Sequence, residues 1–237
     1  MEILIVRHGD PDYEHDTLTE KGVVEAKLLA EKLSKMKIDA CYCSPLGRAK
    51  KTASYTLEKI GQQAEELDWL QEFLGRVTLD GEKRICWDLK PSLWMNDDIY
   101  YTKDWYKTDL MRQHDVEKEY RIVTEAFDEL LKKHGYERNG RYFKVVRGNH
   151  DRIVLFCHYG LCAVLTSYLM GVSPMTFWHH AVAQATSITT FVTEEREKEI
   201  AAFRMLSWGD TGHLYAGGEQ PAFAARFCEC YEDDTLH

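Results

Sequence analysis

The first 61 residues alternate between short apolar runs and longer segments with helical periodicity. The apolar runs are ILIV at 3–6 and the segment DACYC at 39–43, and each has the length of a buried strand. Between them, apolar residues recur at the spacing of an amphipathic helix, at Val23, Ala26, Ala30 and Leu33. Because parallel strands need a long crossover between them, this order predicts an α/β protein with parallel strand pairing.

Residues that begin and end helices mark the same elements. Thr19 suits the N-cap of the first helix. Ser44 and Pro45 suit the N-cap and first position of a second helix, and Gly61 suits its end. The later segments are a helix at 115–135, strands at 141–146 and 152–157, a buried helix at 159–171, and strands at 186–192 and 200–208 around the acidic turn TEEREKE. The whole pattern predicts a three-layer α/β fold, a mostly parallel sheet with helices on both faces.

Two segments interrupt this rhythm. Residues 73–114 are rich in aromatic side chains interleaved with charged ones and show no clean period. We interpret them as a cap-like insertion in a single domain that spans residues 1–237. From about residue 209 the chain is predicted to be an irregular tail, and its end, YEDDTLH, is predicted to fray.

The charge and cysteine content argue against several classes of protein. The chain carries 30 Lys and Arg against 39 Asp and Glu, a net charge of −9, which disfavours nucleic acid and anionic membranes as partners. No apolar run reaches the roughly 20 residues that span a bilayer, and the start MEILIV lacks the features of a signal peptide. The seven cysteines form no ladder of spaced pairs, and no histidine cluster accompanies the two CxC pairs. We therefore expect a cytoplasmic protein without a metal site at these cysteines.

Two of the predicted strands end on a histidine. ILIV is followed by Arg7 and His8, and RIVLFC is followed by His158. Since the carboxyl ends of strands line the ligand crevice of open α/β sheets, both imidazoles are expected in one site. Arg48 falls in the first turn of the second helix, where free backbone N–H groups already favour an anion. Two arginines and two histidines around one point predict a phosphate site.

Four short motifs stand where the predicted strands end or the helices begin. They are RHG after the first strand, LTEKG at the first helix, SPLGRAKKTA at the second helix and CHYG at the end of a later strand. In this order they resemble the histidine phosphatase superfamily, also called the phosphoglycerate mutase-like family. The resemblance covers about residues 1–190, most of the chain. It implies the phosphoglycerate mutase-like form of the α/β fold.

The resemblance also implies catalytic roles. His8 would be the nucleophile that accepts the phosphoryl group, and Arg7, Arg48 and His158 would stabilise the charge of that group. Glu72, two residues after Leu70, would act as the general acid and base for the leaving oxygen and the attacking water. Asp10, two residues past His8, is the alternative acid. These roles predict a phosphomonoester hydrolase with a phosphohistidine intermediate.

Two further residues are assigned to the phosphate. Gly9 is expected to let the backbone turn sharply and to leave room for the substrate. Tyr159 separates the second histidine from Gly160, where the family often has glycine at once, so its phenol is expected to supplement a displaced backbone donor. No metal and no other cofactor is implied, and no oligomeric state is predicted.

Three other functions stay open. Close relatives of the glycolytic mutases follow the glutamate with arginine, histidine, tyrosine and glycine, whereas this chain has Phe73, Leu74 and Gly75, which favours hydrolysis over mutase activity. A module that binds a phosphorylated ligand without turnover is disfavoured because no catalytic part is missing. A metal-dependent hydrolase is disfavoured because Arg7 would repel a cation and the spacing of the candidate ligands fits no metal motif. Those candidates are His8, Asp10, Asp12, His15, Asp16, His158, His179 and His180.

The substrate is expected to be a small phosphorylated molecule. The aromatic insertion is expected to cover the pocket and to select the leaving group. The sequence does not choose between a sugar phosphate, a phosphorylated acid, a nucleotide and a phosphoprotein.

Overall fold

A central sheet of eight strands organises the protein. The computed structural model describes residues 1–232. Within these residues the sheet has the strand order β5-β4-β10-β1-β11-β12-β9-β8. The strands are β1 Glu2–Arg7, β4 Ala40–Cys43, β5 Ala64–Glu66, β8 Tyr136–Asn139, β9 Tyr142–Val145, β10 Arg152–Cys157, β11 Ile188–Glu197 and β12 Ile200–Asp210. The α-helices are α1 Glu20–Leu33, α2 Gly47–Ile60, α3 Val116–Lys133, α4 Tyr159–Met170, α5 Pro174–His180 and α6 Gly212–Ala216.

The sheet is parallel in one half and antiparallel in the other. Strands β5, β4, β10 and β1 pair in parallel. The next four, β11, β12, β9 and β8, join by antiparallel pairing, and β11 also runs antiparallel to β1. The predicted α/β class and its three layers are confirmed, and the sheet is mixed rather than mostly parallel. The reason is that tight hairpins, which impose antiparallel pairing, connect β8 to β9 and β11 to β12.

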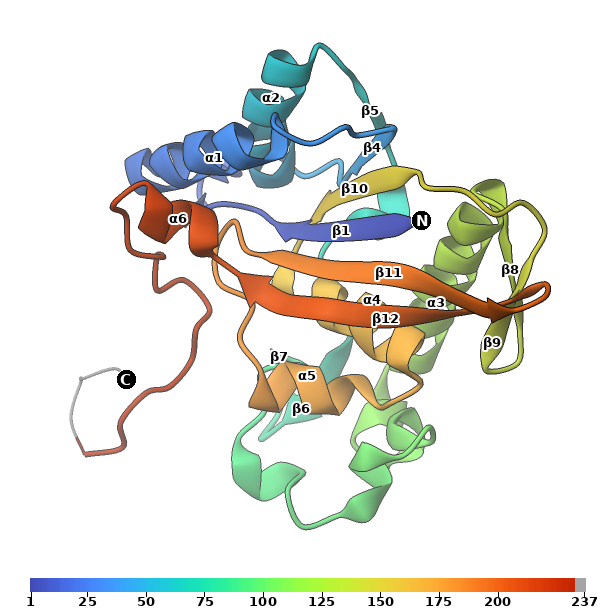
Figure 1. Ribbon diagram of the computed structural model, residues 1–237. Coiled ribbons are helices and arrows are strands. Elements are labelled where there is room, and N and C mark those ends of the chain that lie inside the picture. Colours follow the sequence, from blue (N-terminus) through green and yellow to red (C-terminus); the bar gives the residue numbers. More distant parts are fainter. Residues whose placement is uncertain (233–237) are drawn as a thin grey trace.

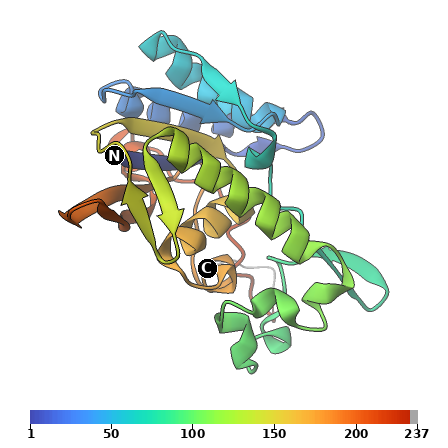
Figure 2. The same cartoon turned by 90° about the vertical axis from the view of Figure 1, so that its right-hand side faces the viewer.

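The alternation of side chains along the central strands explains the two helical layers. Leu4 and Val6 of β1 face one core cluster, which holds residues of α1 and α2. Ile3 and Ile5 face the other cluster, which holds residues of α3, α4, α5 and the segment after β5. Because successive strand residues point to opposite faces, an unbroken apolar strand must be covered on both sides. Figures 1 and 2 show α1 and α2 on one face and α3 and α4 on the other.

The predicted helix ends are largely confirmed. Thr19 caps α1, because its side chain accepts the backbone N–H of Gly22. Gly61 and Gly171 end α2 and α4 in the left-handed conformation, with φ of 65° and 70°. The start of α2 was placed too early, since the helix begins at Gly47 and Ser44 lies before it. Leu46 is the N-cap residue, and Ser44 accepts its backbone N–H at 3.2 Å.

Residues 73–114 form a layer of short elements below the sheet in Figure 1. The hairpin of β6 (Arg76–Leu79) and β7 (Glu82–Ile85) comes first. Four single-turn helices follow, η2 Pro91–Leu93, η3 Asp98–Tyr101, η4 Trp105–Lys107 and η5 Met111–Gln113. Aromatic residues of this segment pack on α5, where Trp105 meets Trp178 at a ring distance of 5.3 Å. Buried aromatic side chains thus hold a segment that has little regular structure of its own.

The last part of the chain is more ordered than a free tail. Strand β12 continues to Asp210 and α6 follows, so regular structure extends into the segment predicted to be irregular. From Gly217 to residue 232 the chain has no helix or extended strand. Residues 233–237, most of the end predicted to fray, lie outside the described residues.

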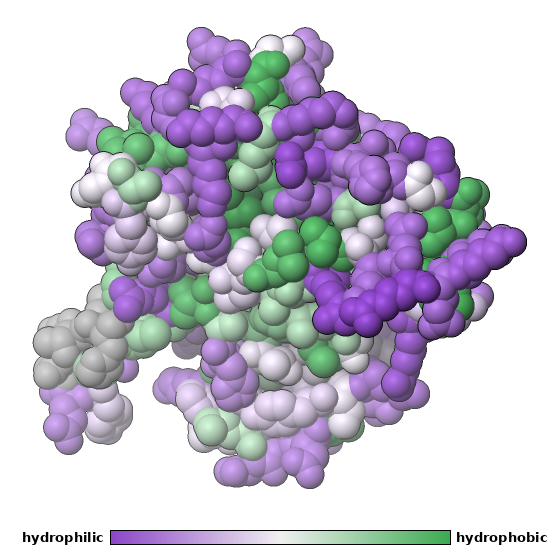
Figure 3. Space-filling view, viewed as in Figure 1, coloured by the Kyte–Doolittle hydropathy of each residue, from purple (hydrophilic) through white to green (hydrophobic). Residues whose placement is uncertain are grey.

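The acidic segment TEEREKE is mostly strand. Strand β11 runs through it to Glu197 and β12 starts at Ile200, which leaves two residues for the turn. Arg204 on β12 donates two hydrogen bonds to Glu194, so opposite charges pair across the strands. Figure 3 shows this hairpin as a hydrophilic ridge, beside smaller apolar patches near the middle of the sheet. In the described part of the chain, no helix is both long enough and apolar enough to cross a membrane.

Candidate active site

The ends of three parallel strands bring His8, His158 and Ser44 together. Strand β1 pairs with β10 so that Arg7 lies opposite Cys157, which places the next residues, His8 and His158, side by side. Strand β4 pairs with the other edge of β10 and ends immediately before Ser44. The rings of the two histidines are 5.1 Å apart. The structure therefore brings together the two histidines that the sequence placed at the carboxyl ends of neighbouring strands.

His8 has one ring nitrogen bound and the other free. Its Nδ1 lies 2.7 Å from the carbonyl oxygen of Gly9, and since a carbonyl only accepts, Nδ1 carries the proton. No hydrogen bond occupies Nε2 within residues 1–232. Burial and the adjacent guanidinium groups of Arg7 and Arg48 hold the pKa of His8 well below 6.5. A neutral imidazole with an unshared pair on Nε2 is the form that a nucleophile requires.

His158 is fully buried and also neutral. Its Nε2 lies 2.8 Å from the hydroxyl oxygen of Ser44, and its Nδ1 is buried with no hydrogen-bond partner among the described residues. Burial, with the neighbouring His8, Arg48 and Arg7, lowers its pKa well below 6.5. One polar atom of this ring is therefore available to a ligand.

Arg48 stands in the first turn of α2, as predicted, and Asp16 holds it there. Asp16 accepts a hydrogen bond of 2.7 Å from Nη1 of Arg48 and one of 2.6 Å from the backbone N–H of Gly47. The guanidinium also lies over the ring of Tyr13 at 5.5 Å. Its Nε is buried and has no partner in residues 1–232. Asp16 was a candidate metal ligand in the sequence, and its position shows that it orients the arginine instead.

Arg7 is 1 % exposed, and backbone carbonyls hold it. Its two Nη groups donate to the carbonyl oxygens of Ala183 at 2.7 Å and Ala224 at 2.8 Å. The Nε group is buried without a partner in the part of the chain that is described. Two carbonyls fix the guanidinium without neutralising it, so its charge acts on His8 and on any anion nearby.

Glu72 is anchored through one carboxylate oxygen. Its Oε1 accepts the backbone N–H groups of Phe73 at 2.9 Å and of Leu161, in the first turn of α4, at 3.0 Å. Neither of these two bonds uses Oε2, and the backbone N–H of Gly160 also interacts with the carboxylate. Burial raises the pKa of Glu72, and the backbone N–H groups and Arg7 partly oppose this. Helix α4 starts directly after His158, so the bond from Leu161 in its first turn holds Glu72 close to this histidine. The Oε2 atom is then the oxygen available for proton transfer.

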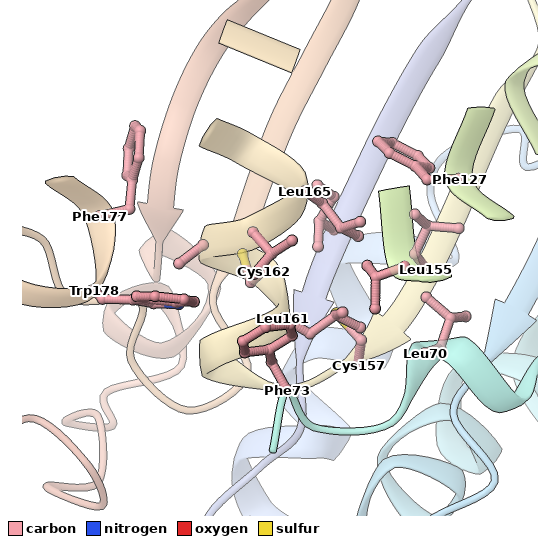
Figure 4. Close-up of a cluster of buried hydrophobic side chains, with 14 of the residues drawn as sticks. Leu70, Phe73, Phe127, Leu155, Cys157, Leu161, Cys162, Leu165, Phe177 and Trp178 are labelled. Carbon is pink, nitrogen blue, oxygen red and sulfur yellow. The ribbon is translucent and has the colours of Figure 1, made fainter. Parts of the chain in front are cut away.

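The neighbours of Glu72 fix its position by burial. Leu70 and Phe73 flank it and are almost completely buried. Figure 4 shows Phe73 beside Leu161 of α4 and Leu70 on the side of Leu155 of β10, within one cluster of buried side chains. A segment without long regular structure thus gains a defined place because two of its side chains belong to the core.

Asp10, the alternative acid, is engaged away from the histidines. Its Oδ2 accepts the hydroxyl of Thr19 at 2.7 Å, and its backbone N–H donates to the buried carboxylate of Glu25 at 2.9 Å. These contacts tie the loop after β1 to the start of α1. Glu72 is therefore the better placed of the two carboxylates.

Gly9 has a different role from the predicted one. A Cβ atom at this position would lie 2.8 Å from the carbonyl oxygen of Gly22, so glycine is needed where the loop packs on α1. Its backbone N–H donates to Thr52 at 2.9 Å and is not free for a phosphate. The close approach that requires glycine is to helix α1, rather than to a substrate as predicted.

The structure also contradicts the predicted phosphate contact of Tyr159. Its hydroxyl lies 2.7 Å from the carbonyl oxygen of Trp178 and 3.0 Å from that of Ala181. The phenol is thus held by the end of α5, and the ring instead lies 5.6 Å from the guanidinium carbon of Arg7. The sequence placed this residue beside the site correctly, and helix packing decided where the hydroxyl points.

Two aromatic residues that the sequence did not single out for the site lie beside it. Trp87 of the insertion packs edge-on against Tyr159 at 5.7 Å and donates to the carbonyl of Phe73 at 2.6 Å. Phe227 of the C-terminal segment lies 6.4 Å from Trp87 and 5.9 Å from Tyr159. In Figure 1 this segment descends from α6 on the side where β1 ends. Because such contacts join distant parts of the chain, no local sequence signal announces them.

The candidate metal ligands do not assemble. Asp12 pairs with His15, while His179 and His180 pack on Trp94 of the insertion. Over residues 1–232, no three or more His, Cys, Asp or Glu side chains form a group that could hold a metal ion. Five of the seven cysteines are buried.

Three buried donors around His8 lack partners. They are Nε of Arg7, Nε of Arg48 and Nδ1 of His158, which carries a proton in one of its two neutral forms. Buried polar groups are nearly always satisfied, so this grouping indicates a ligand with several acceptor oxygens. The fold and this cluster of side chains define an α/β protein with a histidine-centred site suited to an anion.

Residues 3–205 match the histidine phosphatase superfamily (branch 1), and the chain belongs to this family. The sequence is 25 % identical over 225 residues to a probable phosphatase of Schizosaccharomyces pombe, covering 90 % of this chain and 95 % of that protein. It is 24 % identical over 207 residues to phosphoserine phosphatase 1 of Hydrogenobacter thermophilus, covering 83 % and 89 %.

Solved structures share the fold. A mutant phosphoserine phosphatase from Entamoeba histolytica, in complex with phosphoserine, superimposes with a TM-score of 0.58 at 19 % identity, covering 90 % of this chain and 98 % of that one. A mycobacterial glucosyl-3-phosphoglycerate phosphatase with inorganic phosphate gives a TM-score of 0.60 at 19 % identity, covering 90 % and 99 %. The predicted phosphoglycerate mutase-like fold and membership of the histidine phosphatase superfamily are confirmed.

Proposed function

We propose that this protein is a phosphomonoester hydrolase that acts through a phosphohistidine at His8 and needs no metal ion. The observation that supports this most is the state of His8, whose Nδ1 is committed to Gly9 while Nε2 is free among unpartnered donors. The names of the relatives, which are phosphatases, point the same way.

The first step of the proposed reaction is attack on the substrate phosphorus by Nε2 of His8. The phosphorus–nitrogen bond forms, the bond to the leaving oxygen breaks, and protonated Glu72 gives its proton to that oxygen. Arg7, Arg48 and His158 stabilise the charge on the transferring group. The products of this step are a free alcohol and a phosphohistidine.

The second step returns the enzyme to its starting state. Glu72, now a carboxylate, takes a proton from water as the water oxygen attacks phosphorus. The phosphorus–nitrogen bond breaks and inorganic phosphate leaves. The whole cycle consumes one phosphomonoester and one water, and the proton on Glu72 is regenerated.

The surroundings of Glu72 favour a small substrate. Trp87 lies next to Glu72, on the side of the proposed leaving group, and Phe227 packs against Trp87. The position of Trp87 agrees with the proposal that the insertion selects the leaving group. The position of Phe227 adds the C-terminal segment to the residues that surround the leaving group. Relatives that act on phosphoserine or glucosyl-3-phosphoglycerate make small phosphorylated metabolites the first compounds to assay.

Phosphate release from an aryl phosphate tests the proposal directly. The purified protein should release inorganic phosphate at the same rate before and after treatment with a strong chelator, because the proposed chemistry uses only side chains. Loss of activity that returns on adding a divalent cation would identify a metal-dependent hydrolase. Binding of the phosphate ester without release would identify a binding module.

The pH dependence follows from the two shifted groups. His8 must be neutral, and because its pKa lies well below 6.5, it stays neutral through the mildly acidic range. Glu72 must be protonated for the first step, and burial raises its pKa. With an alkyl phosphate, kcat/KM should therefore fall as the pH rises through the raised pKa of Glu72. The Glu72→Gln variant should lose this alkaline limb, and a native profile that rises steadily with pH would contradict the assignment.

A further inference from the structure

The hydroxyl of Ser44 has one hydrogen-bond acceptor, which is Nε2 of His158. Ser44 is completely buried. Its Oγ accepts the backbone N–H of Leu46 at 3.2 Å and lies 2.8 Å from Nε2 of His158. Within residues 1–232 these two are the hydrogen-bond partners of the hydroxyl. Since the Leu46 N–H can only donate, the hydroxyl proton is directed at Nε2 of His158.

The direction of this bond decides where His158 carries its own proton. A neutral imidazole holds one proton, and the partner of one nitrogen sets the state of the other. If Nε2 were protonated, the buried Ser44 proton would lack an acceptor, and Nδ1 would present a bare lone pair to a phosphate oxygen. Both arrangements cost free energy. With the proton on Nδ1, the Ser44 hydroxyl has its acceptor at Nε2, and the Nδ1–H is satisfied once a phosphate oxygen accepts it.

We propose that Ser44 is a positioning residue that holds His158 in the Nδ1-protonated form, so that a neutral imidazole donates a hydrogen bond to the transferring phosphoryl group. The inference rests on the proposed phosphatase function. It explains how a histidine that burial and the nearby His8, Arg48 and Arg7 keep uncharged still serves as a donor.

Nitrogen NMR of the native protein with isotope-labelled histidine tests the protonation state without reference to activity. Long-range proton–nitrogen spectra distinguish protonated from unprotonated ring nitrogens, and the signals of His158 are assigned by their loss in the His158→Asn variant. At neutral pH we expect His158 with Nδ1 protonated and Nε2 unprotonated. The opposite pattern, or a doubly protonated ring, overturns the proposal.

Variants of Ser44 connect this state to turnover. Ser44→Ala should show a mixture of both neutral forms of His158 and should lose about tenfold in kcat, the equivalent of one net hydrogen bond. Ser44→Thr keeps the hydroxyl and should restore both readouts. Ser167→Ala is the matched control, because Ser167 is equally buried and donates only to a carbonyl within α4.

An unchanged His158 spectrum in Ser44→Ala overturns the proposal, even if turnover falls. If the native protein releases no phosphate from any ester, the proposed function fails, while the native spectrum still decides the inference about Ser44. The two failures are thus separate.

Discussion

Replacing His8 with alanine is expected to abolish phosphate release, with a loss of roughly four orders of magnitude or more in kcat, as when other enzymes lose a covalent nucleophile. The physical reason is that Nε2 of His8 is the free nucleophilic atom beside the unpartnered donors of Arg7, Arg48 and His158. Incubation of the native protein with an aryl phosphate and rapid acid-free denaturation should show a phosphoryl group on the peptide that contains His8. That modification should be labile in acid and stable in base, and absent from His8→Ala.

His134→Gln is the control for this experiment. His134 is also a buried histidine, but its partners are Tyr42 and Asp151. Asp151 directly precedes β10, so His134 lies at the opposite end of the strands from His8. The control should keep native turnover and native labelling. Full activity in His8→Ala, with the fold verified by thermal unfolding, would refute the phosphohistidine mechanism.

Replacing Glu72 with glutamine should separate the two steps of the reaction. The amide keeps the anchoring acceptor for Phe73 and Leu161 but cannot transfer a proton. With an alkyl phosphate, turnover should fall by about two to four orders of magnitude, the usual size of general acid–base catalysis. With an aryl phosphate the phenolate leaves without much help, so the first step should be largely preserved. Phosphohistidine should then accumulate, because the base for the second step is missing.

Glu119→Gln is the matched control for Glu72. Glu119 is also partly buried, its pKa is also raised by burial, and it accepts the backbone N–H of Leu74, two residues beyond Glu72. It should behave as the native protein on both substrates. Equal losses on both substrates in Glu72→Gln without accumulation would favour Asp10 or a structural role for Glu72. Efficient interconversion of phosphoglycerates by the native protein would replace hydrolysis with mutase activity.

The layout of the site was accessible from sequence because it follows strand register. Arg7, His8 and His158 stand directly after apolar runs, and parallel pairing of those runs brings their ends together. Arg48 was accessible because a helix start is marked by local residues. Glu72 required the family resemblance, since its segment has no periodicity and is positioned by the burial of Leu70 and Phe73.

The errors share one cause, which is that side-chain direction depends on packing between elements. The hydroxyl of Tyr159 turned to the end of α5, and the space at Gly9 was taken by α1. The mixed pairing of the sheet was missed because a strand looks alike in sequence in either kind of pairing. The pairing direction depends on the connection, since a hairpin gives antiparallel pairing and a crossover gives parallel pairing.

The sequence by itself determined the α/β class, the two strand-end histidines, the helix-start arginine and the family of this protein, because strand length, helical period and capping residues are local properties. Only the tertiary structure decided that Asp16 orients Arg48, that Ser44 meets His158, and that Trp87 and Phe227 flank the pocket. These contacts join residues far apart in the chain, and their geometry is set by how the layers pack, which no local pattern encodes.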